Sequence, residues 1–187
     1  MDHTTRTLLS STRYRRDELG LPPTKELTAV IFVSSRHDKL LFVPMYYNQA
    51  HTATQDKAEV LPFSAPLEEV GYCARKAVLE FDVRPWTGPR HSRPRTESPI
   101  VILSGAKTLR EFDRDFTMIH LESMAGGAIH VSEGRTHSDD PKDGLRIHGY
   151  ISESQHDAAL GDLIMELYHR AQYMKSCPKR PSPSNVR

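Results

Sequence analysis

The sequence predicts an α+β fold, because runs typical of strands alternate with two long helical patterns. Residues 28–34 (TAVIFVS) and 39–46 (KLLFVPMY) are rich in aliphatic and β-branched residues, and a polar turn separates them. This arrangement is typical of a β-hairpin. Apolar residues recur at helical spacing over residues 66–81 and 154–175. The order of elements is therefore hairpin, strand, helix, several strands and helix.

In the first part of this order, the second hairpin strand contains Pro44. Proline cannot donate to a strand ladder, so the strand bends or lies at a sheet edge there. Residues 48–57 are polar and predict a loop, and residues 59–62 predict a short third strand.

The first long helix is predicted over residues 66–81. Pro66 suits the first helical turn, and Glu68 and Glu69 suit its positive end. Pro85 ends the segment. The apolar stripe consists of Leu67, Val70, Ala74, Ala77 and Phe81.

After this helix, we predict strands over residues 99–103, 116–121, 128–132 and 145–151, with a short helix over 107–112. The last helix carries a second apolar stripe on one side. This stripe consists of Leu160, Leu163, Ile164, Leu167, Ala171 and Met174.

The 187 residues suffice for one domain with tails. Residues 1–26 are polar and broken by two prolines, which predicts a flexible N-terminal arm. Residues 27–176 carry the periodic patterns and form the predicted domain. Residues 177–187 are basic and rich in proline and serine, which predicts a disordered tail.

The composition excludes several classes of protein. Lys and Arg number 25 and Asp and Glu number 24, a net charge of +1 that excludes a uniformly basic nucleic-acid binder. No apolar run approaches the roughly 18 residues of a membrane span, and the N-terminus has no signal-peptide core. Two cysteines are too few for a disulfide framework. We therefore expect a soluble cytoplasmic protein with no membrane partner.

Residues 61–83 read LPFSAPLEEVGYCARKAVLEFDV and follow the hairpin directly. This segment resembles the Nudix box, G-x5-E-x7-R-E-U-x-E-E-x-G-U, where U is aliphatic. When Arg75 is aligned with the arginine of the box, Ala77, Glu80 and Val83 match as well. The resemblance implies a Nudix-like α/β/α sandwich with a mixed sheet, an amphipathic box helix and a C-terminal helix.

The departures from the box fall on its metal-binding positions. Lys76 and Leu79 stand where the family has glutamates, and Leu67 replaces the first glutamate. Glu69 and Glu80 share a helix face, but eleven residues at about 1.5 Å rise separate them by roughly 16 Å, too far to share one ion. We therefore predict that the metal site is lost or severely weakened.

The resemblance leaves two catalytic candidates, Arg75 and Glu80, and Glu80 is also the one metal ligand of the box that remains. The alternative for Arg75 is an exposed arginine with a structural role. The alternative for Glu80 is a surface glutamate that is solvated or paired with Lys76. We expect no cofactor unless hydrolysis is retained, in which case the resemblance implies Mg²⁺.

A basic segment at residues 84–95 (RPWTGPRHSRPR) follows the box and contains no acid. Guanidinium groups suit phosphate, and an aromatic face can stack a base. The alternative is a proline-rich solvated loop. The predicted ligand-binding residues are Arg84, Trp86, Arg90, Arg93 and Arg95.

Other candidates for chemistry have simpler explanations. The acidic segment 137–144 is typical of a turn between strands, and Cys73 is typical of a small core residue. None of the ten histidines forms a zinc-finger spacing. Glu97, Glu122 and Glu133 are isolated carboxylates that could complete a site across the fold.

Three functional hypotheses follow. The first is a Nudix-like domain that has lost metal-dependent hydrolysis and binds a nucleotide, an RNA end or a protein. The second is a divergent Mg²⁺-dependent Nudix hydrolase that cleaves a nucleoside diphosphate linked to another group. The third is an α+β protein-interaction adaptor without a small-molecule site. The lost glutamates favour the first hypothesis over the second, and the basic segment 84–95 favours it over the third.

Overall fold

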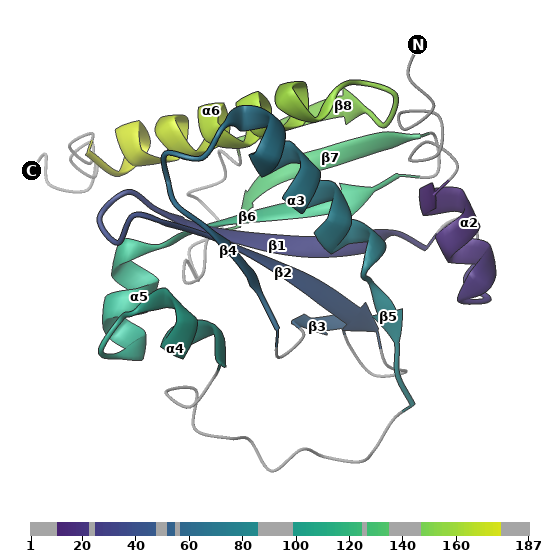
Figure 1. The fold of residues 1–187 in the computed structure, drawn as a ribbon, viewed down its shortest axis with the longest axis horizontal. Helices are drawn as coiled ribbons and strands as arrows, with labels where there is room; N and C mark the ends of the chain where they lie inside the picture. Colours follow the sequence, from purple (N-terminus) through teal and green to yellow (C-terminus); the bar gives the residue numbers. More distant parts are fainter. Residues whose placement is uncertain are drawn as a thin grey trace, which may run out of the picture.

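A computed structural model describes residues 11–22, 25–47, 52–54, 57–85, 99–124, 127–134 and 147–176. The predicted hairpin is confirmed: β1 (Leu27–Ser34) and β2 (Lys39–Tyr47) pair in antiparallel register, with Ile31 opposite Phe42. The turn between them places Asp38 at a φ of 50°. The hairpin forms the middle of the sheet (Figure 1).

The sheet has eight strands in the described residues, and six of them follow the order β3-β2-β1-β6-β7-β8 (Figure 1). The short strands β4 and β5 also pair with β2. All pairs are antiparallel except β2 with β5, so the sheet is mixed and the α+β class is confirmed. The remaining strand bounds are β3 Thr52–Thr54, β4 Glu59–Leu61, β5 Asp82–Val83, β6 Thr117–Ser123, β7 Ala128–Gly134 and β8 His148–Ser152.

One face of the sheet is covered by the two long helices, α3 (Leu67–Leu79) and α6 (Asp157–Ser176), which also pack on each other. The helices touch almost backbone to backbone. A Cβ at Gly161 would lie 2.0 Å from the Leu67 carbonyl oxygen, and one at Gly71 would lie 1.8 Å from that of Asp157. Glycine is therefore required at both positions. The core on this side includes Ile31, Phe42, Phe81, Leu121, Ile129, Leu160 and Ile164.

The opposite face of the hairpin is covered by two short helices, α4 (Pro99–Ser104) and α5 (Leu109–Asp115). They form a second apolar cluster with the outward-facing residues of β1 and β2. Helices therefore lie on both faces of the sheet, as the predicted α/β/α layering requires. The second cluster consists of Val30, Phe32, Leu41, Val43, Ile100, Val101, Phe112 and Phe116.

Two element predictions are wrong. Residues 99–103 form the helix α4 instead of a strand, with Val101 buried and Ile102 67% exposed. A short continuous apolar run does not distinguish a strand from a helix, and here Pro99 occupies the first helical position. The predicted loop at residues 48–57 contains the short strand β3, which pairs with the end of β2.

The predicted flexible arm also differs from the structure over residues 11–22, because Ser11–Glu18 forms helix α2. Arg16 is buried and donates from Nη2 to the Ser123 carbonyl at 2.5 Å and to the Ser123 hydroxyl at 2.7 Å. Thr12 donates to the buried carboxylate of Glu153 at 2.6 Å. Polar contacts thus fix α2 beside the sheet (Figure 1). Because the α2 segment has no apolar stripe, its sequence does not predict that it packs on the domain.

Among the helices of the described residues, none has both the length and the apolar content that crossing a bilayer requires.

Candidate functional site

Arg75, which matches the arginine of the Nudix box, lies buried between α3 and the start of α6. Its Nε donates to Asp157 at 2.5 Å, Nη1 to the Glu153 carbonyl at 3.0 Å and Nη2 to the Gln155 carbonyl at 2.6 Å. The expectation of an exposed arginine is wrong, because its side chain is only 7% exposed. These contacts favour a structural role: Arg75 fixes the turn that leads into α6.

On the side of α3 that faces β4, Lys76 and the C-cap residue Glu80 form two separate ion pairs at the surface. Glu80 lies 2.6 Å from Lys57, and Lys76 lies 2.8 Å from Glu59 on β4. The predicted pair of Lys76 with Glu80 is therefore replaced by a hydrogen bond from Lys76 to Glu59, which raises the pKa of Lys76. Each carboxylate here already has a lysine close to it.

A cavity of about 310 Å³ lies beside these ion pairs, with Phe42, Pro44 and Ala77 among its walls. Lys57, Glu59, Lys76 and Glu80 also line it. The two lysines balance the two glutamates, so the net charge of this wall is close to zero. A Mg²⁺ site requires several hard oxygen ligands directed at one point. The arrangement is suited to holding α3 against β4 and does not fit a metal ion.

Of the predicted ligand-binding residues, Arg84 lies in the described part of the chain. Its Nε is 3.3 Å from the Asp82 carboxylate, and its guanidinium lies 4.4 Å from the centre of the Tyr46 ring. The guanidinium therefore stacks on the domain itself. The other four candidates, Trp86, Arg90, Arg93 and Arg95, lie outside the described residues, as does the acidic segment 137–144.

Cys73 is buried in the core on α3, as predicted. Burial, with a further contribution from Glu59, raises the pKa of its thiol to about 12. Because the thiolate is the nucleophile, this cysteine is unreactive at neutral pH.

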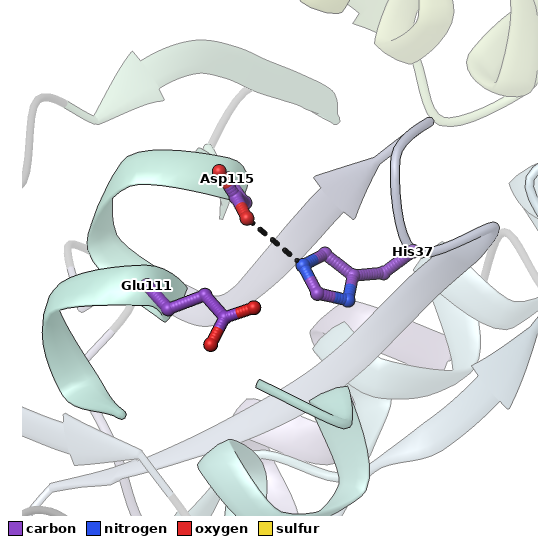
Figure 2. Close-up of side chains that lie close together, drawn as sticks. All are labelled: His37, Glu111 and Asp115. Carbon is purple, nitrogen blue, oxygen red and sulfur yellow. Dashed lines mark hydrogen bonds and ion pairs between the residues drawn. The ribbon is translucent and has the colours of Figure 1, made fainter. Parts of the chain in front are cut away.

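A cluster that sequence analysis missed lies where the β1–β2 turn meets α5. His37, Glu111 and Asp115 each offer a ligand atom within 4.8 Å of the other two. Figure 2 shows the imidazole of His37 directed at the two carboxylates. Its Nε2 lies 3.0 Å from Asp115 Oδ2, and the ring stacks on Phe116 at 5.2 Å. One imidazole and two carboxylates are suitable ligands for a divalent metal.

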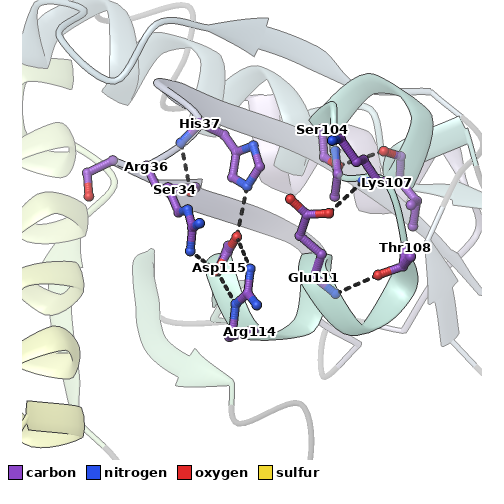
Figure 3. Close-up of polar contacts among 12 residues, drawn as sticks. Ser34, Arg36, His37, Ser104, Lys107, Thr108, Glu111, Arg114 and Asp115 are labelled. Atoms are coloured by element: carbon purple, nitrogen blue, oxygen red, sulfur yellow. Dashed lines mark hydrogen bonds and ion pairs between the residues drawn. The ribbon is translucent and has the colours of Figure 1, made fainter.

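The surroundings of this cluster oppose such a metal. Arg114 donates to both oxygens of Asp115, at 2.6 and 2.9 Å, and Arg36 lies 3.4 Å from Oδ1 (Figure 3). The Arg114 hydrogen bond and the neighbouring charges lower the pKa of Asp115 below its ordinary value. Glu111 accepts a hydrogen bond from the Lys107 backbone at 2.9 Å. Both guanidinium groups therefore already contact Asp115, and Glu111 already accepts from the backbone.

Sequence reasoning missed this cluster because His37 and Asp115 are far apart along the chain and match no motif. Their meeting depends on α5 packing below the hairpin, which the helix prediction over 107–112 did not place. Of the isolated carboxylates, Glu122 lies 3.0 Å from His130, and Glu133 is buried on β7. Glu97 lies outside the described residues.

No protein-family model and no curated protein matches the sequence. The fold is similar to the solved structure of a protein of unknown function from Neisseria meningitidis, with a TM-score of 0.55 and 12% identity over 79% of this chain and 96% of that one. It is also similar to a chain of a CdiA-CT/CdiI toxin and immunity complex from Yersinia pseudotuberculosis, with a TM-score of 0.55 and 11% identity over 78% of this chain and 97% of that one. At these identities the likeness shows the fold alone.

Proposed function

We propose that this chain is a binding domain without Nudix-type hydrolytic activity and that its partner is a protein. The proposal depends on one observation, the charge pairing around α3. Arg75 is used to fix α6, while Glu80 and Glu59 are each paired with a lysine. A Nudix-type reaction requires a metal ion to activate water. The pairing supports the loss of that function.

Two further points support a protein partner over a nucleotide. A chain of similar fold occurs in a toxin and immunity complex, which is an assembly of proteins. The one basic candidate in the described residues, Arg84, is stacked on Tyr46 and paired with Asp82. Binding of a nucleotide or an RNA end through residues 84–95 is the alternative proposal.

The hydrolytic part is tested with the purified chain and a panel of nucleoside diphosphate sugars, dinucleoside polyphosphates, oxidised nucleotides and capped RNA. Reactions contain Mg²⁺, Mn²⁺ or a chelator, and Glu80→Gln runs beside the wild type. We expect no metal-dependent turnover. Turnover that requires metal and is lost in the variant would overturn the proposal and establish a divergent hydrolase.

The binding part is tested by affinity purification from native cells, followed by reconstitution of each recovered protein from purified components. We expect one protein to form a complex of defined stoichiometry with the chain in light scattering. The same panel of nucleotides and RNA serves as the comparison in thermal-shift measurements. Stabilisation by a nucleotide that is lost in Arg93→Glu/Arg95→Glu, with no reconstituted protein complex, would favour the alternative.

A further inference from the structure

The face of β7 and β8 that points away from α6 carries a group of aromatic and imidazole side chains. On β7, Ile129 and Val131 point into the α6 core, so the intervening His130 points to the other face. On β8, Ile151 is in the same core, which places Tyr150 opposite His130 in the register. The ring centres of His130 and His148 are 5.5 Å apart.

His130 is held in one orientation by its neighbours. Its Nδ1 lies 3.0 Å from Glu122 Oε2, and its ring stacks on that of Tyr150 at 4.7 Å with an angle of 24°. The carboxylate next to Nδ1 fixes the proton of the neutral ring on that nitrogen. The other nitrogen, Nε2, then keeps its lone pair.

This Nε2 atom is the unusual feature. It is buried and has no hydrogen-bond partner among the described residues. Buried polar atoms almost always have a partner, so each exception calls for an explanation such as an absent ion or water. A histidine whose second ring nitrogen donates to a carboxylate has the arrangement of a metal ligand with its outer-shell partner.

The distance to His148 fits a shared ion. An imidazole nitrogen lies about 2.0–2.1 Å from bound zinc and roughly 1.1 Å from its own ring centre, so two imidazoles on one ion hold their ring centres about 5–5.5 Å apart. The observed 5.5 Å agrees with that value. His148 is exposed, so its ring can turn toward the ion at low cost.

We propose that His130 and His148 bind a divalent transition-metal ion of the zinc, nickel or copper class. Glu122 acts as a positioning residue that holds His130 in the metal-binding tautomer. Water, or a side chain of a bound partner, completes the coordination. The ion differs from the Mg²⁺ of a Nudix box in both ligand type and place, since imidazole suits transition metals and the site lies away from α3.

The test is calorimetric titration of the metal-free full chain with ZnCl₂ at pH 7.5. We expect one bound equivalent of zinc, with affinity falling at least tenfold in His148→Ala and in His130→Ala. Glu122→Gln should weaken binding by about tenfold, within the range known for outer-shell partners. His148→Ala is the main variant because the residue is exposed and its loss leaves the core intact. Circular dichroism confirms the fold of each variant.

His37→Ala is the matched control, since it removes the histidine of the other cluster and should leave zinc affinity unchanged. A second readout is the visible absorption of Co²⁺, which reports nitrogen ligands directly. Absence of zinc binding overturns the proposal. Binding that persists at full affinity in both His130→Ala and His148→Ala, or that is lost in His37→Ala, places the ion elsewhere and overturns it equally.

Discussion

The two sides of helix α3 use charged residues in opposite ways. On the side that faces α6, the Arg75 side chain is 7% exposed and binds the Asp157 carboxylate and two backbone carbonyls. On the other side, Lys76 is 44% exposed and pairs with Glu59, and Glu80 pairs with Lys57. Both sides contain residues at Nudix-box positions, but their surroundings differ.

This difference shows that a residue can match the motif and still have a purely structural role. A buried arginine that loses its partners, or a partner that loses the arginine, costs several kcal/mol, whereas exposed pairs contribute little. Arg75 is therefore explained by packing alone. Lys76, the next residue of α3, is exposed, so its ion pair contributes little to the stability of the fold. Four predictions test this contrast.

The largest effect is expected for Gly161→Ala, which disrupts the close contact between α6 and the buried side of α3. The new Cβ would lie 2.0 Å from the Leu67 carbonyl oxygen, so α3 and α6 must move apart. We expect a loss of about 4 kcal/mol, above the usual cost of overpacking because the obstacle is backbone. Urea unfolding followed by circular dichroism measures it. Asp162→Ala, on the exposed face of the same helix, should change stability little; equal losses in both would refute the argument.

Arg75→Met should cost about 3 kcal/mol, because it leaves the Glu153 and Gln155 carbonyls and the Asp157 carboxylate without their donor. Methionine keeps most of the apolar volume, so the loss reports the polar contacts. The measurement is again urea unfolding. Lys76→Met, at the next position, should leave stability nearly unchanged. A small effect of Arg75→Met would remove the distinction between the two sides of α3.

The sequence was sufficient to predict the elements whose apolar pattern extends over many residues. The hairpin follows from two aliphatic runs around a polar turn, and the helices α3 and α6 follow from helical spacing. Most residues of the two predicted stripes pack in the core, but Leu67, at the start of α3, is 40% exposed, so its place in the predicted stripe is wrong. It failed for α4, where a short apolar run has no period, and for α2, which Arg16 and Thr12 fix through polar contacts. Such contacts join residues more than a hundred positions apart, so no local pattern records them.

The candidate sites also depend on contacts between distant residues, which a local sequence pattern does not reveal. Arg75 and Glu80 were identified by motif, but only the fold shows which carboxylates and lysines surround them. His37 with Asp115, and His130 with His148, meet through strand register and helix packing. Neither pair has a spacing that a motif could detect.

The third prediction concerns Asp115 on α5. Its side chain is 4% exposed, but the arginines that pair with it are exposed. Its ion pairs are therefore intermediate in burial between those of Arg75 and those of Lys76. Its pKa is lowered in the folded state, chiefly by the Arg114 hydrogen bond, so its stabilising effect is complete above its ordinary value near 3.8. That effect is lost as the pH falls below this value. Asp115→Asn should lower the melting temperature by about 3–4 °C at pH 7.

Calorimetric melting from pH 7 to pH 2.5 checks this expectation. The gap between wild type and Asp115→Asn should narrow as the pH falls below about 4, because the carboxyl of the unfolded wild-type chain then takes up a proton while the folded state, with its lowered pKa, does not. Asp113→Asn, at a neighbouring position of α5, serves as the comparison. A gap that stays constant over the whole range would mean that the ionised carboxylate contributes nothing.

The smallest effect is expected for Glu80→Gln, on the exposed side of α3. The pair with Lys57 has side-chain exposures of 35% and 56%, and such pairs contribute about 0.2–1 kcal/mol. Stability should therefore fall by less than 1 kcal/mol in urea, and 0.5 M NaCl should reduce the difference further, because salt screens exposed charges. A loss close to that of Arg75→Met would show that the exposed pairs hold α3 as firmly as the buried arginine does. The contrast between the two sides of α3 would then fail.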